Sequence, residues 1–237
     1  MGKDRDKRQQ AKRAVRALRA QEQRRQRALW TSILAALLLV IAGMIGYGIY
    51  LTQRPPAEAA PPPGATADGV GIPVGSGPVT IDVYADFLCP ICRQFEENAG
   101  ETLDKLVAEN KATVVYHPVA FLDRYSTTQY STRSAAASGC AAEAGKFREY
   151  AAALFERQPP EGGPGLSNDE LIAIGTELGF GDTFSKCVSS GKYRSWTARV
   201  TDEAARRGVV GTPTVFVNGQ PVSADPQAIT AAVNAAQ

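Results

Sequence analysis

Residues 79–97 read VTIDVYADFLCPICRQFEE, and this short segment contains two different structural patterns. Its first part, Val79 to Phe87, is rich in β-branched and aromatic residues in partial alternation, which predicts a strand. A Cys-Pro-Ile-Cys motif from Cys89 to Cys92 follows directly, and the apolar residues after Arg93 recur at a helical spacing. The segment therefore predicts a strand, a pair of thiols and a helix in immediate succession.

Two cysteines at this spacing serve as part of a zinc site, as a structural disulfide or as a redox pair. A zinc site needs four ligands, and the remaining candidates, Cys140, Cys187 and His117, do not form a second close pair. A structural disulfide across so short a loop removes little entropy from the unfolded chain. The redox use is therefore favoured, and we expect neither a metal nor another cofactor.

The position of the motif at the start of a helix supports redox chemistry. The unpaired N–H groups and the positive dipole end of a helix favour the thiolate of Cys89, which is the species that attacks a disulfide. Cys92 lies one turn further on, where it can displace a bound partner. Pro90 suits the first helical turn, and Ile91 adds neither a charge nor a proton. We expect Cys89 and Cys92 to be catalytic and Pro90 and Ile91 to form the active-site loop.

Charge divides the chain into two unlike parts. Residues 1–27 contain eleven Lys or Arg and three acidic residues, whereas the rest of the chain contains 15 basic and 21 acidic residues. Residues 28–51, between them, contain no charged residue. A helix of this length, at about 1.5 Å per residue, crosses the roughly 30 Å hydrocarbon core of a membrane. The apolar segment is longer than that of a cleavable signal peptide, so we predict a retained transmembrane anchor.

The positive-inside rule orients this anchor. It leaves the basic segment 1–27 in the cytoplasm and everything after Leu51 on the outer side of the cytoplasmic membrane. The basic segment is interpreted as a topology signal in preference to a contact with nucleic acid or anionic lipid, and no nucleic-acid partner is expected. All four cysteines then lie in a compartment where disulfides form and persist.

The remaining sequence predicts a linker followed by one domain. Residues 52–77 are rich in Pro, Ala and Gly and are expected to form an extended linker. From residue 78 to 237 the patterns predict, in order, a strand, a helix, a strand over 111–122 interrupted by Pro118, a helical block over about 125–192, a hairpin with its turn at Asn218-Gly219 and a terminal helix capped by Asp225. This order predicts an α/β fold with a mixed central sheet flanked by helices.

Cys140 and Cys187 both fall inside the helical block. Of the three pairings of four cysteines, the one that joins Cys140 to Cys187 leaves Cys89 and Cys92 as a working pair. Closing a loop of this length would contribute on the order of 4 kcal/mol in the chain-entropy model. We expect a structural disulfide, with a second redox relay as the alternative.

Two segments, DFLCPICRQF at residues 86–95 and GVVGTPTVFVNG at residues 208–219, resemble the DsbA-like branch of the thioredoxin superfamily. The resemblance covers about residues 79–237 and implies a thioredoxin fold with an inserted helical subdomain. It also implies a cis peptide bond at Thr212-Pro213, facing the cysteine pair, where Thr212 offers backbone groups to an extended substrate strand and its side chain tunes the thiolate. The anchor, the linker and the second cysteine pair further resemble the membrane-tethered DsbA-like proteins of actinobacteria.

One position departs from the family pattern. Members often carry a Glu six residues before the first cysteine, which is thought to handle protons for the buried cysteine, and here that position is Val83. Asp82 is expected on the opposite face of the strand. Asp86 is therefore the candidate for proton handling, although capping of the loop is its expected use. His117 is expected to be structural rather than to line the active-site groove, and Phe95 and Trp196 are expected in the core.

The resemblance implies a membrane-anchored, extracytoplasmic thiol–disulfide oxidoreductase that introduces disulfides into exported proteins. Its implied partners are exported proteins with free thiols and a quinone-linked membrane oxidase similar to vitamin K epoxide reductase or DsbB. Two alternatives stay open, since the sequence does not fix the direction of electron flow. One is a disulfide reductase or isomerase of the cell envelope, and the other is a non-catalytic binding module with a thioredoxin-like groove.

Overall fold

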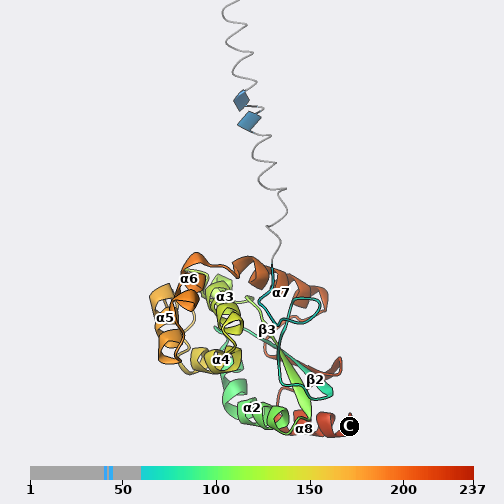
Figure 1. Cartoon of the computed structure of the whole chain (residues 1–237). Coiled ribbons are helices and arrows are strands. Elements are labelled where there is room, and N and C mark those ends of the chain that lie inside the picture. Colours follow the sequence, from blue (N-terminus) through green and yellow to red (C-terminus); the bar gives the residue numbers. More distant parts are fainter. Residues whose placement is uncertain (1–39, 42, 45–59) are drawn as a thin grey trace, which may run out of the picture. The chain divides into compact units, whose positions relative to one another are not determined.

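The computed structural model of the chain describes residues 40–41, 43–44 and 60–237 (Figure 1). The predicted cytoplasmic segment 1–27 and most of the predicted anchor 28–51 lie outside the described residues. The described anchor residues are helical, and the large side chains of Val40, Ile41 and Met44 are exposed. In the described ranges, no helix combines the length and the apolar character needed to cross a membrane. The anchor accordingly stays a prediction.

A five-stranded mixed sheet in the order β1-β3-β2-β4-β5 forms the centre of the domain. β2 and β3 run parallel, and every other neighbouring pair is antiparallel. The mixed sheet predicted from the sequence is therefore confirmed. The strands are β1 (Ile72–Val74), β2 (Val79–Ala85), β3 (Ala112–Pro118), β4 (Thr214–Val217) and β5 (Gln220–Val222).

Helices cover the sheet and form the insertion. They are α2 (Pro90–Ala108), the 3-10 helix η1 (Asp123–Tyr125), α3 (Tyr130–Glu143), α4 (Phe147–Glu156), α5 (Asn168–Glu177), α6 (Asp182–Ser190), α7 (Arg194–Arg206) and α8 (Pro226–Ala235). α2 and α8 pack against each other, while α7 packs on β3 from the opposite side of the sheet (Figure 1). α3 to α6 stand between β3 and α7 in the sequence and make up the inserted helical subdomain. The element order confirms a βαβ unit and a ββα unit around a helical insertion.

Local sequence signals account for several of these boundaries. Ser167 and Glu170 form the predicted capping box at the start of α5. Asp225 caps α8 by accepting hydrogen bonds from two backbone N–H groups, with Pro226 in the first turn. Asn218 and Gly219 both have positive φ, which is the conformation that a tight hairpin turn between β4 and β5 requires.

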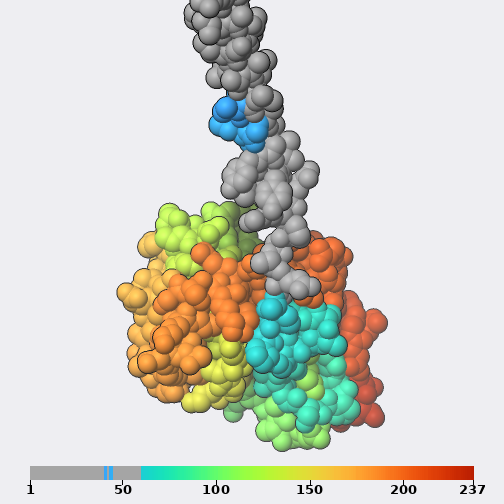
Figure 2. Space-filling model, turned by 45° about the horizontal axis from the view of Figure 1, so that its top comes forward, coloured from blue at the N-terminus to red at the C-terminus, as the bar shows by residue number. Residues whose placement is uncertain are grey.

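The prediction of a linker over residues 52–77 is wrong for residues 69–74, which pack on the domain. Residues 72–74 form the edge strand β1 on β3, and Val70 and Ile72 are buried. Trp196 of α7 donates its indole N–H to the carbonyl oxygen of Gly69 at 2.8 Å. Figure 2 shows this segment, in cyan, packed beside the later helices, in orange. The composition misled because an edge strand needs few apolar residues and tolerates a proline such as Pro73.

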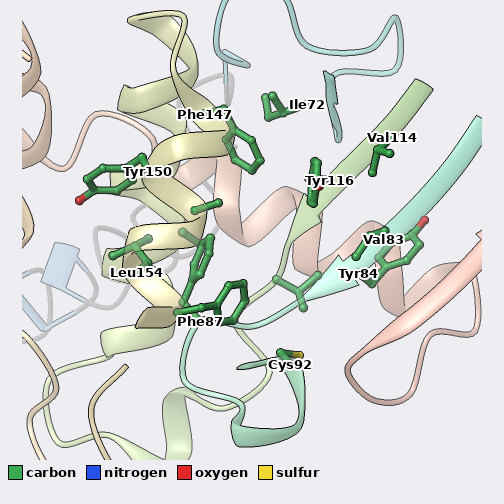
Figure 3. Packing of buried hydrophobic residues seen from close by; sticks show 14 of the residues in the cluster. Ile72, Val83, Tyr84, Phe87, Cys92, Val114, Tyr116, Phe147, Tyr150 and Leu154 are labelled. Atoms are coloured by element: carbon green, nitrogen blue, oxygen red, sulfur yellow. The ribbon is translucent and has the colours of Figure 1, made fainter. Parts of the chain in front are cut away.

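The core lies between the sheet and the helical insertion. Figure 3 shows Phe147 and Leu154 of α4 on one side and Tyr116 of β3 on the other, with Phe87 below and between them. All four side chains are buried. Cys92 lies beyond Phe87 in the same view, so the cysteine pair rests directly on the packed core.

Candidate active site

The loop between β2 and α2 carries the first cysteine to the end of a helix. β2 ends at Ala85, and Cys89 is the N-cap residue of α2 with extended backbone angles, φ −74° and ψ 117°. The N–H of Cys89 donates to the carbonyl oxygen of Asp86 at 3.0 Å, which closes the turn. Pro90 occupies the first helical turn, where its missing N–H costs nothing. The predicted placement of Cys89 at a helix N-terminus is confirmed.

The surroundings of Cys89 stabilise its thiolate. A hydrogen bond from the Cys92 thiol is the largest influence, and it lowers the pKa of Cys89 to about 6 against the opposing effect of burial. The side chain of Thr212 and the backbone N–H groups of Cys92 and Ile91 act in the same direction. At neutral pH the Cys89 sulfur is therefore mainly a thiolate, which is the nucleophilic form.

Cys92 behaves in the opposite way. It lies one helical turn further on and is completely buried. Burial raises the pKa of its thiol well above the usual range, and the hydrogen bond that it gives to Cys89 raises it further. Cys89 is thus the acidic and reactive thiol of the pair, whereas Cys92 is buried and keeps its proton. Both are free thiols in this structure.

The Thr-Pro pair that the resemblance pointed to lies beside Cys89. The Thr212-Pro213 peptide bond is cis, directly before β4. β4 pairs with β2, and this pairing brings the carbonyl oxygen of Thr212 to 3.4 Å from the Cys89 sulfur. Two large apolar side chains near this loop and the motif are exposed to solvent, Val210 at 98% and Ile91 at 54%. The site thus offers backbone groups and apolar surface next to a reactive sulfur.

Asp86 is a completely buried carboxyl group at the base of the active-site loop. Its Oδ1 accepts the N–H of Leu88 and its Oδ2 accepts the N–H of Leu122, each at 2.9 Å. Burial raises the pKa of Asp86 to about 6, although the N–H groups of Leu88 and Leu122 and the side chain of Ser131 oppose the shift. The capping use expected from the sequence is confirmed, and the carboxyl is also poised to titrate near neutral pH.

The other candidate residues form structural contacts or pack in the core. His117 is buried in β3 and forms hydrogen bonds to the carbonyl oxygen of Val70 and to Asp82, at 2.9 and 2.8 Å. These contacts are structural, as expected, and they confirm that Asp82 points away from the buried Val83. Phe95 and Trp196 are buried as predicted.

The second pair of cysteines forms the predicted disulfide. Cys140 of α3 and Cys187 of α6 are bonded, with their Cα atoms 5.9 Å apart. The bond joins two helices of the insertion and leaves Cys89 and Cys92 free. Its structural role stays a prediction.

The contribution of Gln158 to the site was not predicted from the sequence. Gln158, in the loop after α4, donates from Nε2 to the carbonyl oxygens of Phe87 and Cys89, both at 2.9 Å. These partners are 71 and 69 residues away in the sequence. No local pattern indicates such contacts, since they depend on how the insertion folds back onto the active-site loop.

Comparison with known proteins places this geometry among related chains. Residues 74–235 match the family described as thioredoxin. Two solved structures from Mycobacterium tuberculosis are each 35% identical to the chain. Reduced DsbA has a TM-score of 0.63, with 70% of this chain and 92% of that chain covered. The reduced disulfide bond oxidoreductase DsbG has a TM-score of 0.64, with 70% and 87% covered.

A third relative is much longer than this chain. The serine/threonine-protein kinase PknE of Mycobacterium tuberculosis is 35% identical over 181 residues, which are 68% of this chain and 32% of the kinase. The chain thus spans about a third of the length of that curated relative. The match concerns one part of PknE, whereas the likeness to DsbA and DsbG extends over nearly the whole of those structures.

Proposed function

The chain belongs to the thioredoxin family, in its branch of DsbA-like thiol–disulfide oxidoreductases, and we propose that it introduces disulfides into exported proteins. The observation that carries the proposal is the asymmetry between an acidic Cys89 facing Thr212 and a sealed, weakly acidic Cys92. Cys89 is then the sulfur that exchanges with substrates. A stabilised thiolate also leaves readily, which makes the disulfide form an oxidant.

The reaction begins from the Cys89–Cys92 disulfide. A substrate thiolate attacks the Cys89 sulfur, the bond between the two cysteines breaks, and Cys92 leaves and takes up a proton because burial disfavours its charge. A second substrate thiolate attacks the substrate sulfur of this mixed disulfide, which forms the substrate disulfide and releases Cys89 as a thiolate. Two electrons have then passed to the pair. Of the two protons that the substrate thiols lose, one stays on Cys92 and one goes to solvent.

The substrate is an extended, unfolded segment that lies along the Thr212-Pro213 loop. Backbone groups of Thr212 are available beside the Cys89 sulfur, where a substrate strand can pair with them. Exposed Ile91 and Val210 offer apolar surface to a substrate. An unfolded chain has exposed apolar side chains that can contact this surface, whereas a folded protein buries most of them. These features support a broad class of substrates with free thiols.

We assign proton handling to Asp86. Reoxidation of the pair requires Cys92 to lose its proton in the interior, where solvent has no direct access. Asp86 precedes the motif by three residues, and the charge of Cys89 influences its buried carboxyl group, so this carboxyl lies near the cysteine pair. With its pKa of about 6, the Asp86 carboxyl is mainly ionised at neutral pH and can accept that proton.

The reduced pair passes its two electrons to a quinone-linked membrane oxidase similar to vitamin K epoxide reductase or DsbB. The predicted anchor, residues 28–51, holds the catalytic domain on the outer side of the cytoplasmic membrane, where that oxidase and the exported substrates meet it. Treatment of intact spheroplasts with an added protease tests this placement. The protease should cleave the catalytic domain, and full protection of the domain from cleavage would contradict the placement.

Refolding of a reduced, unfolded ribonuclease tests the oxidase reaction. The oxidised full chain in mild detergent should restore nuclease activity by forming native disulfides, and the Cys89→Ser variant should not. Refolding at the same rate with Cys89→Ser would show that the proposed mechanism is wrong.

Trapping of free thiols in cells with an alkylating reagent tests the direction of electron flow. A mainly oxidised Cys89–Cys92 pair supports the oxidase. A mainly reduced pair would indicate a reductase or isomerase, and a pair whose state does not respond to added oxidant or reductant would indicate a binding module.

A further inference from the structure

Gln158 joins the helical insertion to the turn that carries the reactive sulfur. Its side-chain amide donates to the carbonyl oxygens of Phe87 and Cys89, both at 2.9 Å. Phe87 and Cys89 flank Leu88 in the active-site loop, and both are buried. One neutral amide thus holds two carbonyl groups of the same short loop.

These two hydrogen bonds fix the orientation of the loop because a peptide unit is planar. The carbonyl of Phe87 shares its plane with the N–H of Leu88, which donates to Asp86. The carbonyl of Cys89 shares its plane with the nitrogen of Pro90, the first residue of α2, and it also accepts the first helical hydrogen bond from Arg93 at 3.2 Å. Gln158 therefore holds the last turn of the loop and the first turn of the helix together.

The same segment of the insertion also packs on the loop through apolar contact. The ring of Phe155 lies against Phe87, with centroids 5.0 Å apart, and the backbone N–H of Gln158 donates to the carbonyl oxygen of Phe155 at 3.2 Å. A second polar tie runs from Asp86 to the N–H of Leu122, just before the insertion. The loop is thus supported by the segment just before the insertion and by the insertion itself.

The Cys89 thiolate depends on this support. It is stabilised by the backbone N–H groups of Ile91 and Cys92, which face the sulfur only while α2 begins at Cys89. We propose that Gln158 is a positioning residue, whose amide holds the active-site loop in the conformation that presents these N–H groups to Cys89. The inference rests on the oxidoreductase role of the cysteine pair and is independent of the direction in which electrons flow.

Titration of the Cys89 thiolate in the reduced full chain, by its ultraviolet absorbance, tests this assignment. Gln158→Leu removes both donors and should raise the pKa of Cys89 by about one unit, a tenfold fall in the thiolate fraction at a pH below that pKa. At a pH above both pKa values, the equilibrium with glutathione should shift about tenfold toward the disulfide form, since the thiolate stabilises the reduced protein. Gln158→Glu keeps the shape but sets an anion against two carbonyl oxygens, and it should shift the pKa further.

Arg157→Ala is the matched control. Arg157 precedes Gln158 in the same loop, and its ion pair is with Glu177 of α5. This variant should leave the pKa of Cys89 unchanged. A wild-type pKa in both Gln158 variants, with a loss of thermal stability like that of Arg157→Ala, would show a merely structural role and overturn the proposal. Because the titration needs no substrate, the two proposals can fail separately. If the Gln158 variants shift the pKa of Cys89 but the wild-type chain fails to refold ribonuclease, only the proposed oxidase function is refuted.

Discussion

Cys89→Ser tests the electrostatic basis of the site through stability. The folded-state pKa of Cys89 is about 6 against an ordinary value of 9.0. A group whose pKa is depressed by folding stabilises the folded state above the unfolded pKa, and this stability is lost as the pH falls through the folded pKa. The window for the reduced protein is therefore pH 6 to 9. Each pKa unit corresponds to about 1.4 kcal/mol. Because the thiol of the unfolded chain is already half ionised at pH 9, the interval from pH 7 to pH 9 predicts a gain of about 2 kcal/mol.

Urea denaturation of the reduced full chain in mild detergent measures this gain. The buried Trp196 reports unfolding once Trp30, the other tryptophan of the chain, is replaced by Phe. The free energy of unfolding should rise by about 2 kcal/mol from pH 7 to pH 9 relative to Cys89→Ser. The oxidised chain, which has no thiolate, should not show the rise. A difference between the two proteins that stays constant over this range would refute the assignment of a stabilised thiolate to Cys89.

Three further changes test other parts of the site. Asp86 has its pKa raised from 3.8 to about 6, so its ionisation destabilises the folded chain as the pH rises through that interval. Asp86→Asn should remove a loss of roughly 2 kcal/mol between pH 4 and pH 6, and equal pH slopes of the urea midpoint in both proteins would contradict this. Thr212→Val removes a side chain that lowers the pKa of Cys89, and ultraviolet titration of the thiolate should show the pKa rising. Replacing Cys140 and Cys187 together by Ala opens a loop with a sequence separation of 47 and should cost on the order of 4 kcal/mol of unfolding free energy with no change in the thiolate titration. Loss of ribonuclease refolding at unchanged stability would instead favour the redox relay.

The fold could be predicted wherever a segment carries its own signal. The period-2 pattern of residues 79–87 and the helical spacing after Arg93 reflect burial of one face, so they survive in the sequence. Alternation also placed Asp82 and Val83 on opposite faces of β2, as the structure has them. β1 could not be predicted in this way, because three residues are too few for a period. Its strand conformation comes from pairing with Tyr116 and its neighbours on β3.

The residues of the site likewise fall into those with a local sequence signal and those without one. The cysteine pair, its place at a helix start and the Thr212-Pro213 loop followed from motifs. Gln158 and Leu122 did not, because a Gln after a helix and a Leu before a short turn are ordinary residues until the chain folds. Their contribution lies in which backbone group they meet, and that depends on the packing of the whole insertion.

The reactivity of Cys89 therefore has a local origin and a non-local adjustment. Its local stabilisation comes from Cys92 and the N–H groups of the first helical turn, and any Cys-x-x-Cys motif at a helix start shares these. Burial acts against them, while Thr212, on a segment 123 residues away in sequence, acts with them. The CPIC motif alone thus predicts a reactive thiolate but not its pKa. If the insertion sets the geometry through Gln158, chains with the same motif and a different insertion should differ in the pKa of the first cysteine.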